Sequence, residues 1–341
     1  MKNFCRILTG SFLPAVCFVY IISLSGCSGL SLSKEENPKT ETSEQFSETE
    51  PVILVDKDNG AVNQETDTEE APEKAEEEKA EEKTEDESEE EPWILDFVDV
   101  FGEHYLTEIL PDVEKHDYIN ECFTHSGDKL SYEGDDRYKY RLGVDVSHHQ
   151  GSIDWEKVRA QGYEFAFLRI GYRGYGSAGV LGADREFESN YKKAVNAGLD
   201  VGVYFFAQAV NEEEALEEAD FVLKLLDGKE LQLPVVYDPE SILDDVARTD
   251  DVSGEQFTKN TRVFADRIRD AGYEPMIYNN MLWEAFEFDL SQLRDLEIWY
   301  ADYELLPQTP YHFSFWQYSN EGRVDGISGV CDLDIELRKV E

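Results

Sequence analysis

The sequence is short of positive charge, and it contains few cysteines and no metal-binding motif. Its 341 residues include 31 Lys and Arg against 75 Asp and Glu, so the formal net charge is −44. A chain this acidic repels polyanions, which argues against nucleic acid as a partner. The five cysteines form no CxxC pair, and no HExxH run is present. We therefore expect neither a metal site nor a cofactor.

The longest apolar run lies at the N-terminus. Lys2 and Arg6 precede an apolar stretch over residues 12–24, which is the pattern of an export signal. The stretch ends in LSGC at residues 24–27, which resembles the bacterial lipobox. We expect residues 1–26 to be a lipoprotein signal peptide and Cys27 to carry a lipid that anchors the protein to the outside of the bacterial cell membrane. An uncleaved signal anchor is the alternative.

Two regions of different composition follow. Glutamate dominates residues 27–92, where aromatic residues are very few, so we expect a disordered acidic tether. A single charged helix is the alternative, because Glu, Lys and Ala favour helices. Residues 93–140 contain too few apolar residues for a core of their own, and we expect an extension that packs on the next domain. Export would allow a disulfide between Cys122 and Cys331, but their wide separation gives it little support.

From residue 141 onward, strand-like and helix-like segments alternate. Strands are expected at 142–147, 164–170, 200–206, 233–240, 275–278, 296–300, 313–318 and 331–335. Helices are expected at 154–160, 184–197, 211–226 and about 254–271, with Asp154 and Asn211 as caps, and they shrink after residue 279.

Alternation of this kind is typical of parallel βαβ units. We therefore predict an α/β fold over residues 141–341: a TIM-like β/α barrel with eight strands and about five crossover helices, degenerate in its C-terminal part. An open doubly wound sheet is the alternative, but no glycine-rich phosphate loop follows the first strand.

Four carboxylates fall on strands that would meet at one rim. Asp238 and Glu240 end an apolar run, and their i, i+2 spacing projects both from one face of a strand. Taken alone, they fit a helix cap as well as a catalytic pair. Asp145 lies near the end of the first strand and Asp332 in the last, and these strands are neighbours in a closed barrel. Because clustered unpaired acids oppose folding, their convergence favours catalysis.

Aromatic residues accompany the acids at the strand ends. A sugar ring has an apolar face that can lie against an aromatic plane, although for any one aromatic an ordinary place in the core is the alternative. As a set beside the acids they favour a carbohydrate cleft, and the predicted substrate-binding aromatics are Tyr204, Phe206, Tyr278, Trp299, Tyr300 and Trp316. The adjacent His148 and His149 lack a third ligand, so we interpret them as polar loop residues.

Several motifs resemble one known family. Residues 145–155, DVSHHQGSIDW, are similar to the opening motif of glycoside hydrolase family 25, the Chalaropsis-type lysozymes. Further matches are RIGYRGY at 169–175, GVYFF at 202–206, Asp238-x-Glu240, YNN at 278–280, WQY at 316–318 and GISGVCDLD at 326–334. The resemblance covers roughly residues 141–341. One departure is Arg169-Ile170-Gly171, where some relatives carry Lys-x-Ser/Thr-Glu-Gly.

The resemblance implies an enzyme that hydrolyses the β-1,4 bond between N-acetylmuramic acid and N-acetylglucosamine, with retention and without a metal. It implies that Glu240 is the general acid/base and that Asp238 stabilises the acetamido group or the oxocarbenium-like sugar. Asp145 and Asp332 would line the same site and tune the pair, and Gln317 would contact substrate. The nucleophile is either an Asp carboxylate or the acetamido group. The expected partner is peptidoglycan, and the expected state is a monomer.

Three alternatives share parts of this pattern. A catalytically silent wall-binding module on the same barrel is disfavoured, because a binder does not need a buried acid pair. A chitinase-like enzyme is disfavoured because the longer Asp-x-x-Asp-x-Asp-x-Glu run is absent, with Val235, Val236 and Tyr237 ahead of Asp238. An exported solute-binding protein fits the anchor but not the acids.

Overall fold

The computed structural model of the protein describes residues 92–243 and 245–340. The signal peptide, Cys27 and the acidic tether were predicted within residues 1–92, so almost all of that region lies outside the described residues.

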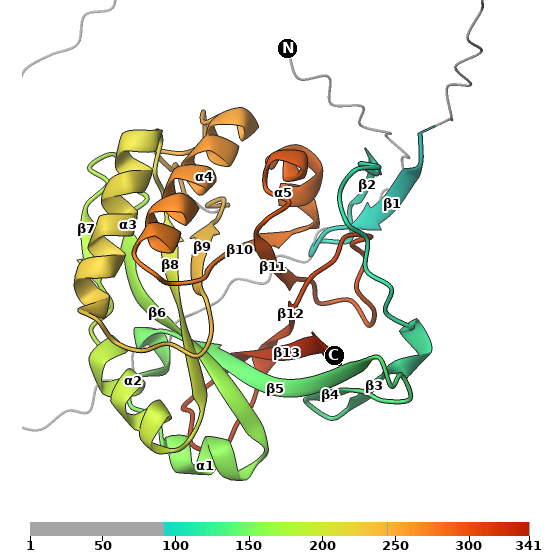
Figure 1. Cartoon of the computed structure of the whole chain (residues 1–341), viewed down its shortest axis with the longest axis vertical. Helices are drawn as coiled ribbons and strands as arrows, with labels where there is room; N and C mark the ends of the chain where they lie inside the picture. Colours follow the sequence, from blue (N-terminus) through green and yellow to red (C-terminus); the bar gives the residue numbers. More distant parts are fainter. Residues whose placement is uncertain (1–91, 244, 341) are drawn as a thin grey trace, which may run out of the picture. The chain divides into compact units, whose positions relative to one another are not determined.

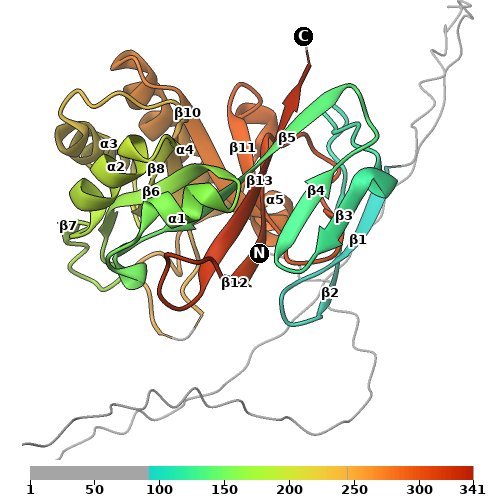
Figure 2. The ribbon, with the colours of Figure 1, turned by 90° about the horizontal axis from the view of Figure 1, so that it is seen from below.

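Eight strands close into a barrel, as predicted (Figures 1 and 2). Their order around the ring is β5 (Tyr138–Val146), β13 (Cys331–Lys339), β12 (Phe315–Gly322), β11 (Glu297–Ala301), β10 (Pro275–Asn280), β9 (Val235–Pro239), β8 (Asp200–Ala207) and β6 (Tyr163–Arg173). Pairing between β5 and β6 closes the ring. The short β7 (Leu181–Ala183) adds to β6 as an antiparallel edge strand.

Five helices connect successive strands from β5 to β11, as predicted. They are α1 (Trp155–Ala160), α2 (Phe187–Asn196), α3 (Glu212–Leu226), α4 (Gly254–Asp270) and α5 (Met281–Phe286), with short 3-10 turns at His148–Gln150 and Leu290–Gln292. The side chains of Asp154 and Asn211 accept hydrogen bonds from Lys157 N and Glu214 N, which confirms both caps. Helices α2, α3 and α4 lie together on one side of the barrel (Figure 1).

The last strand, β13, runs antiparallel to both of its neighbours, β12 and β5. No helix separates β12 from β13 in the described chain, and a short link can only return a strand in the opposite direction. This reversal places the beginning of β13, rather than its end, at the barrel mouth. Asp332 therefore lies opposite Asp145 in the β13–β5 register.

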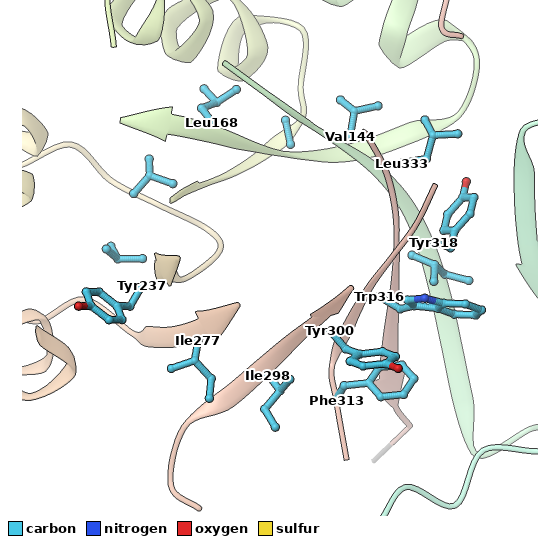
Figure 3. Close-up of a cluster of buried hydrophobic side chains, with 14 of the residues drawn as sticks. Val144, Leu168, Tyr237, Ile277, Ile298, Tyr300, Phe313, Trp316, Tyr318 and Leu333 are labelled. Atoms are coloured by element: carbon cyan, nitrogen blue, oxygen red, sulfur yellow. The ribbon is translucent and has the colours of Figure 1, made fainter. Parts of the chain in front are cut away.

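Alternate residues along each strand face opposite sides of the barrel wall. One buried cluster fills the inside and includes Phe165, Phe167, Met276, Trp299 and Phe315. The other surrounds the barrel and includes Val144, Leu168, Tyr237, Ile277 and Leu333 (Figure 3). The apolar inward residues thus fill the barrel away from its mouth, and polar side chains lie at the mouth.

Gly143 on β5 lies where the barrel interior has no room for a side chain. A Cβ atom there would lie 2.2 Å from Cε2 of the buried Phe165 ring. We expect Gly143→Ala to lower the free energy of unfolding by about 1–3 kcal/mol, because a methyl group would overpack the interior. Urea unfolding measures this. Gly176→Ala is the control, since a Cβ at Gly176 meets nothing within 4 Å; an equal loss in both variants would contradict the packing argument.

Residues 92–137 form two antiparallel hairpins and the segment between them. The first hairpin consists of β1 (Ile94–Val98) and β2 (His104–Glu108), and the second of β3 (Phe123–Ser126) and β4 (Lys129–Tyr132), with a 3-10 turn at Asn120–Cys122. Phe97 and Tyr118 are buried in the cluster that surrounds the barrel. Cys122 and Cys331 are both buried free thiols. We call residues 92–137 the N-terminal extension.

Candidate active site

A cavity of about 390 Å³ opens at the mouth of the barrel. The ends of β5, β8, β9, β10 and β11 and the beginning of β13 contribute to its wall. All four predicted acids, Asp145, Asp238, Glu240 and Asp332, line it. The convergence expected from strand position is therefore what the structure shows.

Asp238 and Glu240 enter the cavity together from the end of β9. Val236 on the same face belongs to the cluster inside the barrel, so the i, i+2 rule carries Asp238 and Glu240 inward above it. Pro239 between them is the last residue of β9. Asp238 is 4% exposed, and among the described residues nothing donates a hydrogen bond to its Oδ1. Asp238 thus has a buried oxygen that no described residue satisfies.

The acids hold their protons more tightly than free carboxyl groups do. Burial raises the pKa of Glu240 to about 7, with Asp332 adding to the shift and Arg169 opposing it. Burial likewise raises the pKa of Asp332 to about 6. The pKa of Asp238 lies well above its usual range because of burial and the nearby Glu240. Near neutral pH the site can therefore hold a protonated and an ionised carboxyl group at once.

Asp145 is held by a short polar network. Gln317 Nε2 donates to Asp145 Oδ2 at 2.8 Å. The hydroxyl groups of Tyr278 and Tyr303 both donate to Gln317 Oε1, at 3.0 and 2.9 Å. Because two donors meet the amide oxygen, the amide nitrogen is directed at Asp145. Burial, with Asp332 and Asp334 nearby, raises the pKa of Asp145 well above its usual range.

The backbone of Glu240 is held by a second network behind β9. Gln208 Nε2 donates to the Glu240 carbonyl oxygen at 2.8 Å, and Thr249 Oγ1 donates to Gln208 Oε1 at 2.9 Å. The backbone N–H of Gln208 donates to Glu218, which is fully buried and paired with Arg173 at 2.8 Å. These contacts fix the chain just after the strand, where Glu240 must keep its orientation.

Arg169 is the one Lys or Arg side chain among the described residues that lines the cavity. Its Nε donates to Asp184 Oδ2 at 3.0 Å, and it also contacts His148 Nδ1. The backbone N–H of His148 donates to the same Asp184 oxygen at 2.9 Å. Asp184 thus aligns the arginine, which provides positive charge beside four acids. His149 lines the cavity, and the side chain of His148 lies beside Arg169.

The predicted substrate-binding residues divide into two groups. Tyr204, Phe206, Tyr278, Trp299 and Gln317 line the cavity.

Tyr300 and Trp316 do not line it, and the prediction for these two is wrong. Both are fully buried in the outer cluster near Phe313 (Figure 3). Their neighbours Trp299 and Gln317 face inward, so the strand alternation turns Tyr300 and Trp316 outward.

Tyr303, Arg169 and Asp334 make polar contacts in or beside the cavity, and none of them was a predicted site residue. Tyr303 lies two residues after the end of β11, a strand-end position that could have indicated it. Arg169, on the second barrel strand, was quoted in a matching motif and in a departure from another, but it was not predicted as a site residue. Asp334, two residues after Asp332, is fully buried, and Trp299 Nε1 donates to its Oδ1 at 2.9 Å.

No group of three or more His, Cys, Asp or Glu side chains in 92–243 and 245–340 is arranged to hold a metal ion. No helix in the same ranges is long and apolar enough to cross a membrane.

Comparison with known proteins agrees with this geometry. The chain is 28% identical over 193 residues to the autolytic lysozyme of Clostridium acetobutylicum, covering 56% of this chain and 54% of that protein. It is 29% identical over 203 residues to lysozyme M1 of Streptomyces globisporus, covering 56% and 65%. The match thus spans between half and two thirds of these relatives.

The solved structure of the modular autolysin LytC from Streptococcus pneumoniae, in complex with synthetic peptidoglycan ligand, has the same fold. The TM-score is 0.52 at 23% identity, over 70% of this chain and 56% of that one. Residues 144–327 match the model of the Glycosyl hydrolases family 25. Because this match takes in more than half of the 341 residues and includes three of the four cavity acids, the chain belongs to glycosyl hydrolase family 25.

Proposed function

We propose that the protein is a muramidase that hydrolyses peptidoglycan at the β-1,4 bond between N-acetylmuramic acid and N-acetylglucosamine, with retention of configuration. The observation that carries this proposal is the pair Asp238 and Glu240, both directed into one cavity, with the pKa of Glu240 raised to about 7. A carboxyl group that is still protonated near neutral pH can act as a general acid.

In the proposed reaction, Glu240 donates its proton to the glycosidic oxygen as the bond from that oxygen to C1 of the muramic acid unit breaks. The leaving N-acetylglucosamine unit gains a hydroxyl group at its C4. Asp238, whose Oδ1 accepts no hydrogen bond from the described residues, stabilises the positive charge that develops on the sugar or its acetamido group. The nucleophile, an Asp carboxylate or the acetamido group of the substrate, forms a bond to C1 on the face opposite the leaving oxygen. Water then displaces it from C1 while Glu240 takes a proton from that water, so the two displacements retain the configuration.

The remaining cavity residues support a sugar substrate. Tyr204, Phe206, Tyr278 and Trp299 supply aromatic surface, while Gln317 and Arg169 supply hydrogen-bond donors. Apolar faces and polar edges in one cleft match the two kinds of surface that a sugar ring presents. The negative charge of Asp332 adds to the burial that keeps a proton on Glu240.

A digest of purified peptidoglycan tests the proposal. The products are reduced with borohydride, and the newly formed reducing sugar is identified by mass spectrometry. We expect new reducing muramic acid with the wild-type chain and none with Glu240→Gln. New reducing N-acetylglucosamine would assign a different bond, and binding to peptidoglycan without release of any fragment would point to a silent wall-binding module.

The pH dependence of kcat/KM gives a separate prediction. Because Glu240 must be protonated to act as the acid, kcat/KM should fall about tenfold for each pH unit above its pKa of about 7. The negative charge of Asp332 helps to raise that pKa, so Asp332→Asn should shift the alkaline limb to lower pH. Rates measured at constant ionic strength from about pH 4 to about pH 9 test this; an alkaline limb that does not move in Asp332→Asn contradicts it.

We also propose that the chain is anchored by a lipid on Cys27 at the outer face of the bacterial membrane, with the acidic segment as a spacer and the enzyme acting as a monomer. The support is the signal-like pattern of residues 2–27, since an anchor there would hold the enzyme next to its substrate. Separation of membrane and soluble fractions tests the anchor: Cys27→Ser should move the protein to the soluble fraction.

A further inference from the structure

The loop between β11 and β12, residues 302–314, carries Tyr303 into the cavity. Tyr303 lines the cavity and donates to Gln317 Oε1 at 2.9 Å, and Gln317 in turn donates to Asp145 at 2.8 Å. Yet the Tyr303 side chain is 38% exposed, so its contacts at the cavity cover it only in part. The position of this active-site residue therefore depends on what holds the rest of the loop.

The first hairpin of the N-terminal extension binds the middle of the loop through Gln308. The Val98 N–H donates to Gln308 Oε1 at 2.8 Å, and Gln308 Nε2 donates to the Val98 carbonyl oxygen at 3.0 Å. This pair of bonds occupies both ends of one amide side chain, so it fixes the orientation of Gln308 as well as its position. The hairpin lies close to α5, where the rings of Phe97 and Tyr105 pack near Phe286 (Figure 1).

The rest of the extension binds the loop at further points along its length. His116 N–H donates to the Pro310 carbonyl oxygen at 3.1 Å, and His312 N–H donates to the Glu114 carbonyl oxygen at 2.9 Å. The remaining contacts are Leu110 N to Tyr311 Oη, Tyr118 Oη to the Phe313 carbonyl oxygen, His116 Nε2 with the Thr309 carbonyl oxygen and His125 Nε2 with the Leu305 carbonyl oxygen.

Asp302 connects the part of the loop that the extension binds to Tyr303. The Gln308 N–H donates to Asp302 Oδ2 at 2.9 Å, and the Tyr300 hydroxyl donates to the same oxygen at 2.8 Å. Asp302 is buried, and its backbone N–H donates to the Gln317 carbonyl oxygen at 3.1 Å. Gln308 and Tyr303 are thus joined through one buried aspartate, which also touches the residue that binds Asp145.

We propose that the N-terminal extension is a positioning element of the active site, which holds the β11–β12 loop through Gln308 so that Tyr303 and Gln317 keep Asp145 in place. The extension lies outside the family match over residues 144–327. Because the effect is read out through catalysis, the proposal rests in part on the proposed muramidase activity. Gln308 acts through other residues and is a positioning residue.

The test compares Gln308→Ala, Tyr303→Phe and the double variant, each in the full chain. We expect each single variant to lower kcat/KM on peptidoglycan fragments by about tenfold. The double variant should be no less active than the less active single variant, because both substitutions interrupt the same chain of contacts from Gln308 to Asp145. Losses that multiply in the double variant overturn the proposal. Gln161→Ala is the matched control, since the Gln161 amide also binds backbone carbonyls, of Lys157 and Asp325, but lies outside the cavity lining.

Hydrogen exchange provides a readout that does not depend on activity. In Gln308→Ala we expect faster amide exchange in residues 302–313 and no change in the strands β8 and β9. Unchanged exchange in that loop overturns the proposal, and so does faster exchange with an unchanged kcat/KM. If the wild-type chain releases no fragment from peptidoglycan, the muramidase proposal fails, while the exchange experiment still decides whether the extension holds the loop.

Discussion

Replacement of Glu240 by Gln is expected to lower kcat for peptidoglycan cleavage by about 10²–10⁴-fold, because the amide has no acidic proton to give to the leaving oxygen. Glutamine keeps the size of the side chain, and the backbone contact from Gln208 Nε2 to the residue-240 carbonyl oxygen is not affected. KM should therefore change little. Initial rates of reducing-end release on peptidoglycan fragments measure both constants, and a variant that keeps more than about a tenth of the wild-type kcat would contradict the role of Glu240.

Stability gives this variant an internal control. The pKa of Glu240 in the folded protein, about 7, lies above its ordinary value of 4.5. Stability therefore falls between about pH 4.5 and pH 7, because Glu240 loses its proton in the unfolded chain there while the folded protein still holds it. Gln carries no such penalty, so Glu240→Gln should be more stable than wild type by about 1–3 kcal/mol above pH 7 and similar to it near pH 4. Urea unfolding at the two pH values measures this, and an unstable variant would show that the loss of activity reflects misfolding.

The second large effect is expected from Asp238→Asn, with a loss in kcat of about 10²–10³-fold. Asp238 has a buried oxygen that accepts no hydrogen bond from the described residues, and it lies next to the proton donor. Removal of its charge should weaken stabilisation of the positively charged transition state more than binding of the neutral ground state. We therefore expect kcat to fall with little change in KM.

The exposed Asp325→Asn variant is the matched control, since it makes the same chemical change outside the cavity lining. A rise in KM with an unchanged kcat in Asp238→Asn would show that Asp238 serves substrate binding only.

The barrel and the four acids could be predicted because their signals are local. An apolar run that ends in Asp238 and Glu240 indicates a strand end, and the i, i+2 spacing sets both side chains on one face. Alternation of strands with helices then indicates that strand ends meet at one rim. Asp145 could be predicted from its place near the end of the first barrel strand. Asp332 could be predicted from its place on the last strand, which neighbours the first in a closed barrel.

The site residues that were predicted wrongly or missed are those whose position depends on which face of a strand they occupy or on a contact with a distant part of the chain. Tyr300 and Trp316 lie near strand ends, but the composition of a strand does not tell which of two adjacent residues faces inward. Once Trp299 and Gln317 are known to face the cavity, period-two alternation turns the other two outward. Tyr303 lies in a loop whose position depends on contacts such as Val98 with Gln308, 210 residues apart. No short-range pattern encodes a contact of that kind.

The reversed last strand also has a consequence for the order in which the cavity is completed during folding. Asp332 comes to lie opposite Asp145 only when β13 inserts between β12 and β5, and β5 precedes β13 by about 190 residues in the chain. Pairings between such distant segments form late and slowly, because the intervening chain must first be ordered. We therefore expect the set of four acids to be completed only in the step that closes the barrel. A partly folded chain would hold Asp238 and Glu240 without Asp332, so hydrolytic activity should appear in refolding experiments only with the final, ring-closing phase.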